Sequence, residues 1–567
     1  MIADGAPGRA RRPWWPLFFV AVATAIMLPE LLWGLSASDS YRYNLLWTDE
    51  FTSQFAAGNP WPRWLSQSWD GLGAPTFYHY PPLFFWVAAL IRTPLFDLVG
   101  AQAAASLASL LILAASGGAM YLWLRRFGSP IAALVGALAY EAAPYHLYDI
   151  FARGSLAEAS AYAALPLVPM AIERIADRRR GGVALLAGGY ALLVLGHMPS
   201  ALIASISLIP AYFLYRVRPL GAAVALRGAG GILLGLALSA AYLWPAIGLL
   251  PFTLSEAFGG AWFDPLNWAF WTPQRWPSAG RAMLNILFAS TALIATIAAF
   301  FGRRSDADRG ALRFWALLAI ALFLLIAGFP PMISQISQMT MVQFPARLMP
   351  DADFVAITAL VIARPPLTRP LTIAALLLAI MGWLVMAQAM IGRTYSVRSI
   401  AARSQALVLD DRRDAPTFLP AAVPMPIAPD ELFGANPSLV RLPERGWLVR
   451  GQGARIIVSQ DGESIDATVE TPSATTLVAR RYAYPIWRVR DERGSIIVPT
   501  AQPVTGLVTW PTPAGRHHYR LEPGPAPGER ASLLVSFLAL MLLGLTLWQP
   551  LRSSLRKVLP FTARTSS

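Results

Sequence analysis

Acidic side chains gather in a polar stretch that follows the first long apolar run of the chain. Asp49 and Glu50 are adjacent in LLWTDEFTSQFAAGNPWPRW. Paired carboxylates of this kind can act as a general base or bind a hard divalent cation such as Mg²⁺ or Mn²⁺. The alternative is an acidic loop that only faces water. Because further ionisable residues accompany the pair, the sequence favours the chemical role.

The same stretch continues through Arg63 to WDGLGAPTFYHYPPLFFW, where Asp70, His79 and Tyr80 stand directly before an apolar segment. The glycines permit a tight backbone path, and the two prolines suit the start of a helix. We therefore expect a polar loop joined to an interfacial helix. Asp70, His79 and Tyr80 would lie at the level of a lipid headgroup.

A second set of ionisable residues occurs in YEAAPYHLYDIFARGSLAEA, at the end of another apolar run. It holds Glu141, His146, Asp149, Arg153 and Glu158. Ionisable groups at the ends of apolar helices are costly unless they are paired or face water, so they usually mark a site or a polar cavity. The simpler interpretation is a local helical pair between Asp149 and Arg153, four residues apart.

Two shorter motifs stand at similar positions later in the chain. LGHMPSAL places His197 in a tight turn, where it could line the site or only cap a helix, and VQFPARLMP places Gln343 and Arg347 just before an apolar run. The histidines show no HxxxH spacing of the kind that zinc sites use, so a metal, if bound, would be held by Asp49 and Glu50.

Anion binding on this side of the chain would depend on arginine. Lys557 is the single lysine and lies in the C-terminal tail. Arg63, Arg153 and Arg347 are therefore the groups that could hold a lipid phosphate, for which a bidentate guanidinium contact is the expected geometry. We expect Asp49, His79, Arg153, His197 and Arg347 to line one cavity.

The elements that must position these residues are membrane helices. The chain is 56% hydrophobic and 14% charged, far from the balance of soluble domains, and apolar runs long enough to cross a bilayer recur along it. The predicted spans are residues 14–36, 100–124, 129–144, 157–175, 181–197, 199–216, 228–250, 281–301, 311–328, 350–364, 370–391 and 531–549.

Arginine clusters between the spans predict the topology. With the N-terminus in the cytoplasm, the clusters after residues 124, 175, 216, 301, 364 and 549 all face inward, as the positive-inside rule requires. A full span at residues 80–96 would invert every later loop, so this short segment is predicted to be a juxtamembrane helix. A re-entrant piece is the alternative. The site residues then all fall on the outer side.

The chain divides into three parts on this basis. Residues 1–391 form a transmembrane domain with a large first outer loop at 37–99. Residues 392–530 contain alternating segments such as ARIIVS, IDATVE and TTLVAR between glycine and proline turns, which predict an exported β-sandwich. Residues 531–567 form a final transmembrane helix and a cytoplasmic tail.

The charge and the cysteine content exclude other classes. The net charge of +14 comes from short arginine clusters between apolar runs rather than from one face or tail, which argues against nucleic acid as a partner. The chain has no cysteine, so a disulfide, a thiolate metal site and a cysteine nucleophile are excluded.

The order of these motifs resembles a group of bacterial and archaeal membrane proteins classed as 6-pyruvoyl-tetrahydropterin synthase-related, within the GT-C glycosyltransferase superfamily. The resemblance rests on TDEFTSQFAAGNPWPRW with GLGAPTFYHYPPLFFW, then YHLYDIFARGSLAEA, GHMPSAL and QFPAR. RRYAYPIWRVRDERG and PAGRHHYRLEP are similar to the β-domain of YfhO-type proteins. The resemblance spans most of the chain.

This resemblance implies a polyprenyl-phosphate-dependent glycosyltransferase of the bacterial inner membrane. A sugar would pass from the lipid-linked donor to a glycan, lipid or protein acceptor on the outer face. Asp49 would be the general base, with Glu50 beside it, and Arg153 and Arg347 would stabilise the leaving phosphate. Competing hypotheses are a flippase or transporter of polysaccharide precursors, which would need charges deep inside several spans, and a non-catalytic scaffold of envelope polysaccharide assembly.

Overall fold

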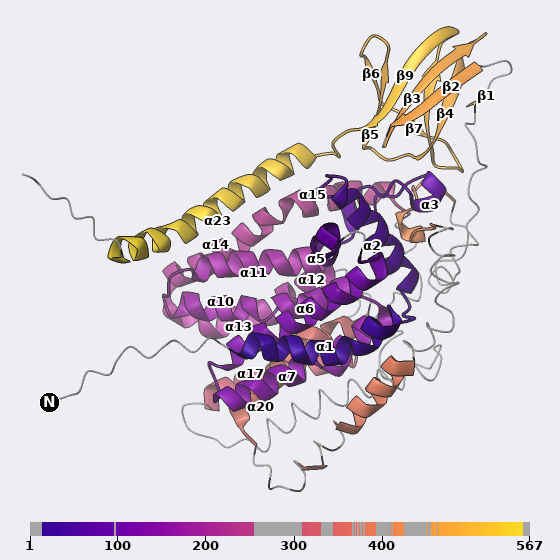
Figure 1. Cartoon of the computed structure of the whole chain (residues 1–567). Helices are drawn as coiled ribbons and strands as arrows, with labels where there is room; N and C mark the ends of the chain where they lie inside the picture. Colours follow the sequence, from indigo (N-terminus) through magenta and orange to yellow (C-terminus); the bar gives the residue numbers. More distant parts are fainter. Residues whose placement is uncertain are drawn as a thin grey trace, which may run out of the picture.

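The computed structural model describes residues 14–95, 98–254, 309–329, 344–365, 380–392, 412–424, 449–450, 455–461 and 463–558, with single residues between 366 and 379 and at 409. The long helices lie side by side, and a β-domain stands beyond one end of them (Figure 1). The helices of this bundle are α1 (Trp15–Trp33), α6 (Ala101–Leu124), α7 (Pro130–Glu141), α9 (Leu156–Ala164), α10 (Leu167–Ala176), α11 (Gly182–Gly196), α12 (Met198–Ile206), α13 (Leu208–Arg216), α14 (Ala222–Leu238), α15 (Ala240–Leu249), α17 (Arg309–Ile326), α20 (Met349–Ala363) and α23 (Glu529–Val558).

Several helices are long and apolar enough to cross a membrane. Within the described residues, five helices meet this condition, and six do if α14 and α15, which meet at a bend of 63°, form one span. The predicted number of twelve spans is therefore not confirmed. The predicted span at 281–301 lies outside the described residues, and the one at 370–391 is described in part.

The predicted juxtamembrane segment contains a short helix. α5 (Leu83–Arg92) is 10 residues long, about half of the roughly 20 residues that a bilayer crossing needs. It buries Phe84 and Phe85 against the bundle, while Leu90 is 65% exposed. A helix with one apolar face inward and an apolar side chain outward suits the boundary between protein, lipid and water, although its depth in a bilayer stays a prediction.

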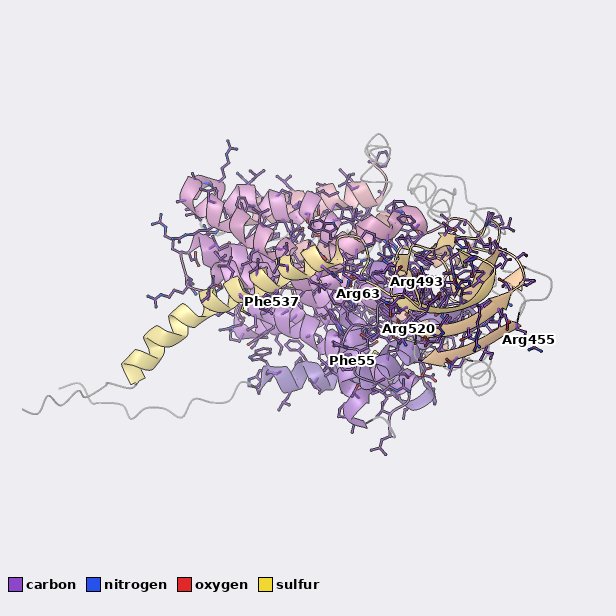
Figure 2. The ribbon with its side chains drawn as sticks, turned by 90° about the horizontal axis from the view of Figure 1, so that it is seen from above. Phe55, Arg63, Arg455, Arg493, Arg520 and Phe537 are labelled. Carbon is purple, nitrogen blue, oxygen red and sulfur yellow. The ribbon has the colours of Figure 1, made fainter. Side chains whose placement is uncertain are left out.

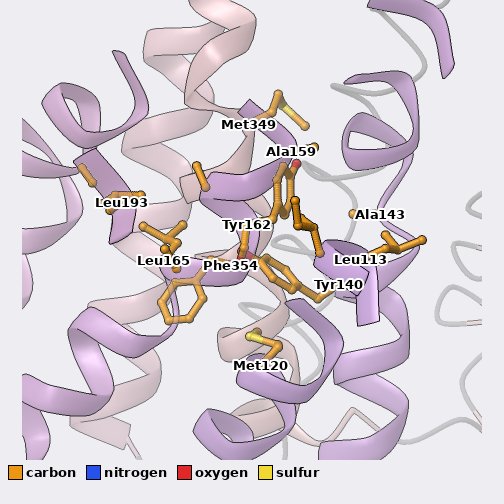
Figure 3. Packing of buried hydrophobic residues seen from close by; sticks show 14 of the residues in the cluster. Leu113, Met120, Tyr140, Ala143, Ala159, Tyr162, Leu165, Leu193, Met349 and Phe354 are labelled. Carbon is orange, nitrogen blue, oxygen red and sulfur yellow. The ribbon is translucent and has the colours of Figure 1, made fainter. Parts of the chain in front are cut away.

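Large aromatic residues form the centre of the bundle. Trp123 of α6 contacts Trp315 of α17 and Phe354 of α20, with ring centroids 5.8 and 5.5 Å apart. Tyr140 of α7 and Tyr162 of α9 pack beside Phe354, as Figure 3 shows. The buried rings therefore hold helices together that are far apart in the sequence.

Arginine-rich turns meet at one end of the bundle, which we call the arginine end. Arg126 after α6 and Arg216 at the end of α13 both contact Asp177, each at 3.0 Å. Arg364, directly after α20, donates to the carbonyl of Phe127 at 2.7 Å. These contacts confirm that the clusters after residues 124, 175, 216 and 364 lie together. The cluster after residue 301 lies outside the described residues. Which side that is stays a prediction.

The first outer loop lies at the opposite end, which we call the loop end. It contains α2 (Tyr41–Ala56), α3 (Ser68–Gly71), α4 (Thr76–His79) and α5. Beside it lie α8 (Pro144–Tyr148), the π-helix η2 (Asp149–Arg153) and the 3₁₀-helix η8 (Pro345–Leu348). The backbone N–H groups of Asp39 and Ser40 donate to Ala152 and Arg153 of η2, at 2.9 and 3.0 Å. The predicted outer segments therefore share one end.

The β-domain is a sandwich of two antiparallel sheets, as predicted. One sheet has the strand order β1-β4-β8-β7 and the other the order β2-β3-β9-β5-β6. The strands are β1 (Val449–Arg450), β2 (Arg455–Asp461), β3 (Ser464–Thr471), β4 (Thr475–Tyr482), β5 (Trp487–Asp491), β6 (Ile496–Ile497), β7 (Thr500–Ala501), β8 (Leu507–Thr512) and β9 (Gly515–Pro523).

The core of the sandwich includes side chains from the first outer loop. Trp64, Trp69 and Leu72 belong to the same buried cluster as Val489 and Trp510 of the strands. Trp64 packs edge to face against Trp487 of β5, with ring centroids 5.2 Å apart. The β-domain and the loop are thus one packed unit, rather than a separate domain on a linker.

Candidate functional site

Two arginines and two carboxylates converge at the loop end in a group that we call the Arg153 cluster: Tyr145, Asp149, Arg153, Glu158 and Arg347. Arg153 Nη1 contacts Asp149 Oδ1 at 2.6 Å, Glu158 Oε2 at 2.8 Å and the Tyr145 hydroxyl at 2.8 Å. Tyr145 donates to the other oxygen of Glu158 at 3.0 Å, and Arg347 Nε lies 3.9 Å from Glu158 Oε2. The predicted local pair of Asp149 and Arg153 is confirmed, but it belongs to this larger network.

The cluster is positioned by an irregular turn of helix. Asp149 and Arg153 begin and end the π-helix η2, a rare conformation that occurs frequently at functional sites. Gly154 ends it with φ +66°, and a Cβ there would lie 2.2 Å from Ser38 Oγ. Glycine therefore lets the chain turn sharply while the loop before α2 packs directly against η2.

The Arg153 guanidinium keeps donors for a further partner. All of its recorded contacts use Nη1, and within the described residues its Nε and Nη2 donate to no protein group. The side chain is 18% exposed, whereas those of Asp149 and Glu158 are fully buried. Because guanidinium presents its donors as a planar fork, the unused edge of Arg153 suits a phosphate oxygen pair.

The electrostatics of the cluster favour an anion. Burial and the neighbouring Glu158 carboxylate raise the pKa of Asp149 well above its usual range, despite the opposing effect of Arg153. Burial lowers the pKa of Arg153, but Glu158 and Tyr145 more than compensate, so the guanidinium remains charged. A raised pKa of Asp149 reduces the negative charge that opposes the guanidinium groups of Arg153 and Arg347.

His197 and Tyr80 border the cluster. His197 is the N-cap of α12, where its Nδ1 accepts from the Ser200 backbone N–H at 3.3 Å, so the capping role that the sequence left open is present. Burial and then Glu158 raise the pKa of Tyr80.

His146 lies in the bundle core beside the cluster. It is completely buried, and its ring stacks on Tyr162 with centroids 3.9 Å apart and planes 2° apart. Burial lowers its pKa to about 3. The recorded contact is a packing contact, and the predicted role of His146 in substrate binding stays a prediction.

Asp49 and Glu50 contact other partners. Asp49 Oδ1 lies 3.2 Å from Arg92 and its Oδ2 lies 3.8 Å from Arg412. Glu50 is buried and accepts from the Gln67 backbone N–H and the Ser68 hydroxyl, both at 3.0 Å. Two guanidinium groups beside Asp49 and two donors on Glu50 do not fit a divalent cation. Within the described residues, no group of three or more histidines and carboxylates could hold a metal ion.

The remaining residues of the first outer loop join it to other elements. Arg63 pairs with Glu529 at the start of α23 at 2.7 Å, and its guanidinium lies 3.8 Å from the Trp61 ring centroid. Asp70 pairs with Arg480 of β4 at 2.8 Å. The His79 ring stacks on Phe418, with centroids 5.9 Å apart.

Of the five residues predicted to line one cavity, the contacts bring three together. Arg153, His197 and Arg347 gather around Glu158, but the contacts of Asp49 and His79 are with other groups. Gln343 lies outside the described residues.

Two acidic residues of this region were not among the predicted site residues. Asp39 is exposed, and its backbone N–H donates to η2 next to Arg153. Its signal in the sequence is its place in LSASDS, directly after the first span. Asp414 is buried and accepts from Trp47 Nε1 and the Thr76 hydroxyl, each at 2.6 Å, and from the Ser68 hydroxyl at 3.1 Å. Nothing in the sequence around Asp414 indicates this role.

Comparisons with known proteins find likeness in structure only. No protein family model and no curated protein sequence matches the chain. The chain is similar to the arabinofuranosyltransferase AftD from Mycobacteria (mutant R1389S, class 2), with 15% identity and a TM-score of 0.42, over 68% of this chain and 28% of that chain. It is also similar to ArnT from Cupriavidus metallidurans bound to undecaprenyl phosphate, with 16% identity and a TM-score of 0.41, over 70% of this chain and 77% of that chain. The chain thus spans little more than a quarter of the length of AftD.

Proposed function

We propose that the chain is a membrane glycosyltransferase that moves a sugar from a polyprenyl-phosphate donor to a glycan, lipid or protein acceptor. The observation that carries this proposal is the open edge of Arg153 in a largely buried cluster that also holds the guanidinium of Arg347. Such a cluster suits a lipid-linked phosphate at the boundary of a membrane bundle. The site would face the outer side of the bacterial inner membrane, with the N-terminus in the cytoplasm.

In the proposed reaction, an acceptor hydroxyl oxygen attacks the anomeric carbon of the donor sugar. A glycosidic bond forms, the bond from that carbon to the phosphate oxygen breaks, and polyprenyl phosphate leaves with the electron pair. The anomeric configuration inverts. Arg153 and Arg347 stabilise the leaving phosphate, and a carboxylate accepts the proton of the acceptor hydroxyl. A carboxylate in contact with the phosphate would repel it. Glu158 and Asp149 therefore act by positioning Arg153, with which both are paired.

Two carboxylates are candidates for the base. Asp49 is the residue predicted from the sequence, and it pairs with Arg92 and Arg412. Asp39 is exposed, and its backbone contacts η2 beside Arg153. A base must reach the acceptor hydroxyl while the donor phosphate lies on Arg153. Because its backbone lies next to the turn that carries Arg153, we propose Asp39 as the base and keep Asp49 as the alternative.

The experiment that tests the function uses the purified full-length chain in nanodiscs with radiolabelled polyprenyl-phosphate sugars and an envelope extract as acceptor. Transfer of label is expected from the unaltered chain. Arg153→Ala should lower the rate by about 100-fold or more, the range for losing one donor to a developing negative charge. Arg153→Lys should recover little, because ammonium cannot form the bidentate contact.

The matched control is Arg179→Ala, which removes an arginine from the arginine end. The Arg179 side chain is 65% exposed, so this variant should transfer label at the unaltered rate. Thermal unfolding midpoints should show that both Arg153 variants fold. If no sugar donor gives transfer, or if folded Arg153→Ala remains fully active, the proposal is wrong.

A further inference from the structure

The outer face of the five-stranded sheet carries a regular array of charged side chains. Register pairs Arg455 of β2 with Glu470 of β3, and Glu470 with Arg516 of β9. Because side chains alternate along a strand, this row points to the face opposite the buried Val469. The next rows on the same face contain Thr468 with His518, and Asp466 with Arg520.

Arginines outnumber carboxylates on this face. Arg520 lies 3.3 Å from Asp466, and Arg490 lies 2.9 Å from Glu522, so part of the charge is paired. Within the described residues, Arg455 and Arg516 form no ion pair. Among the outward residues whose side chains the structure describes, the charged ones are Arg455, Arg488, Arg490, Arg516 and Arg520 against Asp466, Glu470 and Glu522. The excess among these side chains is therefore positive.

Within the described residues, the sandwich contacts the first outer loop through its other sheet and its core, not through the charged face. β4, in the four-stranded sheet, contacts the first outer loop through Arg480 and Asp70, and the Tyr482 backbone N–H donates to Leu72. The inner faces of both sheets form the buried core. Figure 2 shows Arg455 and Arg520 on the β-domain, beyond the end of the helices. The charged face thus takes no recorded part in holding the domain to the bundle.

We propose that this face binds an anionic polysaccharide, a polymer whose sugars carry carboxylate or phosphate groups. Arg455 and Arg516 stand two strand spacings apart, about 10 Å, and can contact successive acidic groups along an extended chain. Guanidinium binds carboxylate and phosphate with paired hydrogen bonds. The outward residues of β2, β3, β5 and β9 include no tryptophan, tyrosine or phenylalanine on which neutral sugar rings could stack. Charge therefore determines the preference.

The role of the bound polymer as the acceptor rests on the proposed function, but the binding itself does not. Binding to the sheet would hold an acceptor next to the first outer loop, because that loop and the sandwich share one core. This surface would select acceptors by charge and leave the chemistry to the loop end.

The test measures binding of fluorescent oligogalacturonate, which is anionic, and of a malto-oligosaccharide of equal length, which is neutral. The full-length chain is placed in nanodiscs of zwitterionic lipid. We expect binding of the anionic probe only, with an affinity that falls as salt is raised. Arg516→Glu should weaken this binding at least tenfold.

The matched control is Arg493→Glu, which makes the same change of charge in the turn between β5 and β6. Arg493 is exposed and lies in a turn rather than on the strands that carry Arg455 and Arg516, so this variant should keep most of the affinity. Unchanged thermal midpoints should show that both variants fold. Equal binding of the two probes, or equal effects of the two variants, would overturn the proposal.

Two further outcomes separate this proposal from others. Binding to vesicles of anionic lipid, without binding of oligogalacturonate, would identify the face as a membrane contact and overturn the proposal. If the anionic probe binds as expected but no sugar donor gives transfer, the proposed function fails while the binding surface stands.

Discussion

At the scale of single residues, Glu158 shows how a buried carboxylate can serve an anion site without touching the anion. It contacts Arg153 at 2.8 Å and accepts from Tyr145 at 3.0 Å, and Arg347 lies 3.9 Å away. A lone buried charge would be very unfavourable, so these partners are needed for folding as well as for orientation. These contacts hold the Arg153 side chain in place through Nη1 and leave its Nε and Nη2 to donate to an anion.

The choice between the two candidate bases can be tested directly. Asp39→Asn keeps the size of the side chain but removes its basicity, so we expect at least a 100-fold lower rate of sugar transfer, within the range for general-base catalysis. Asp49→Asn should lower the rate less and should mainly weaken the contact with Arg92. Initial rates at saturating donor, measured across pH, check both. The reverse order of effects would return the role to Asp49.

Glu50 should make stability depend on pH. Burial and the nearby Asp414 raise its pKa from 4.5 to about 8 in the folded chain. The folded state therefore holds a proton that the unfolded state releases above pH 4.5. This contribution to stability is complete below pH 4.5 and is lost as pH rises towards 8, by at most about 1.4 kcal/mol per pH unit.

Thermal midpoints of the unaltered chain and of Glu50→Gln, measured from pH 5 to 9, check this prediction. The amide cannot ionise, so the variant should lose less stability than the unaltered chain as pH rises. Parallel curves for the two proteins would show that Glu50 does not carry the effect. Asp414, whose pKa burial also raises, contributes with the same sign and would remain in both proteins.

At the scale of elements, the π-helix η2 and the loop before α2 form one contact unit. Gly154→Ala places a Cβ where Ser38 Oγ now lies and also disfavours the left-handed backbone at φ +66°. We expect a loss of stability of about 1 to 3 kcal/mol and a fall in transfer rate, because the turn that ends at Arg153 must shift.

Gly188→Ala is the matched control for this prediction, since its Cβ would meet no atom within 4 Å in the middle of α11. It should be neutral or slightly stabilising, as alanine favours helix. Denaturant unfolding and initial rates measure both variants. If Gly154→Ala behaves like the control, the tight contact between η2 and the loop is not required.

Local sequence signals predicted some of these elements and contacts, but they did not predict contacts between distant parts of the chain. The spacing of Asp149 and Arg153 predicted their pair, because four residues make one helical turn. The alternating strands predicted the sandwich. The docking of Asp414 on Trp47 and Thr76 was not predicted, because it joins residues more than 300 positions apart. Only the folded path of the chain brings them together.

At the scale of the whole molecule, the two ends of the bundle differ in chemistry. Arginine-rich turns meet at one end, and the Arg153 cluster lies at the other. Among the described residues, the arginine distribution predicted that the turns after α6, α10, α13 and α20 share an end. It did not predict that Asp49 and Arg63 form ion pairs with residues outside the Arg153 cluster. Which residues pair at one end of the bundle depends on how the side chains pack.

The orientation of the bundle can be tested with single cysteines, because the chain has none of its own. Ala57→Cys introduces a thiol at the loop end and Ala223→Cys one at the arginine end, both at exposed positions. In intact cells, a thiol reagent that cannot cross the inner membrane should label the first variant only. Labelling of the second variant alone would invert the proposed topology and place the site in the cytoplasm.

The common core of the first outer loop and the β-domain has a consequence for biosynthesis. Asp70 and its partner Arg480 are 410 residues apart, so translation at about 5 to 20 residues per second separates them by some tens of seconds. During that interval Trp64 and Trp69 have no strands to cover them, and in the proposed topology they would already lie outside the membrane. In that topology the exposed loop would need a holding chaperone on the outer side until the strands of the β-domain have been made.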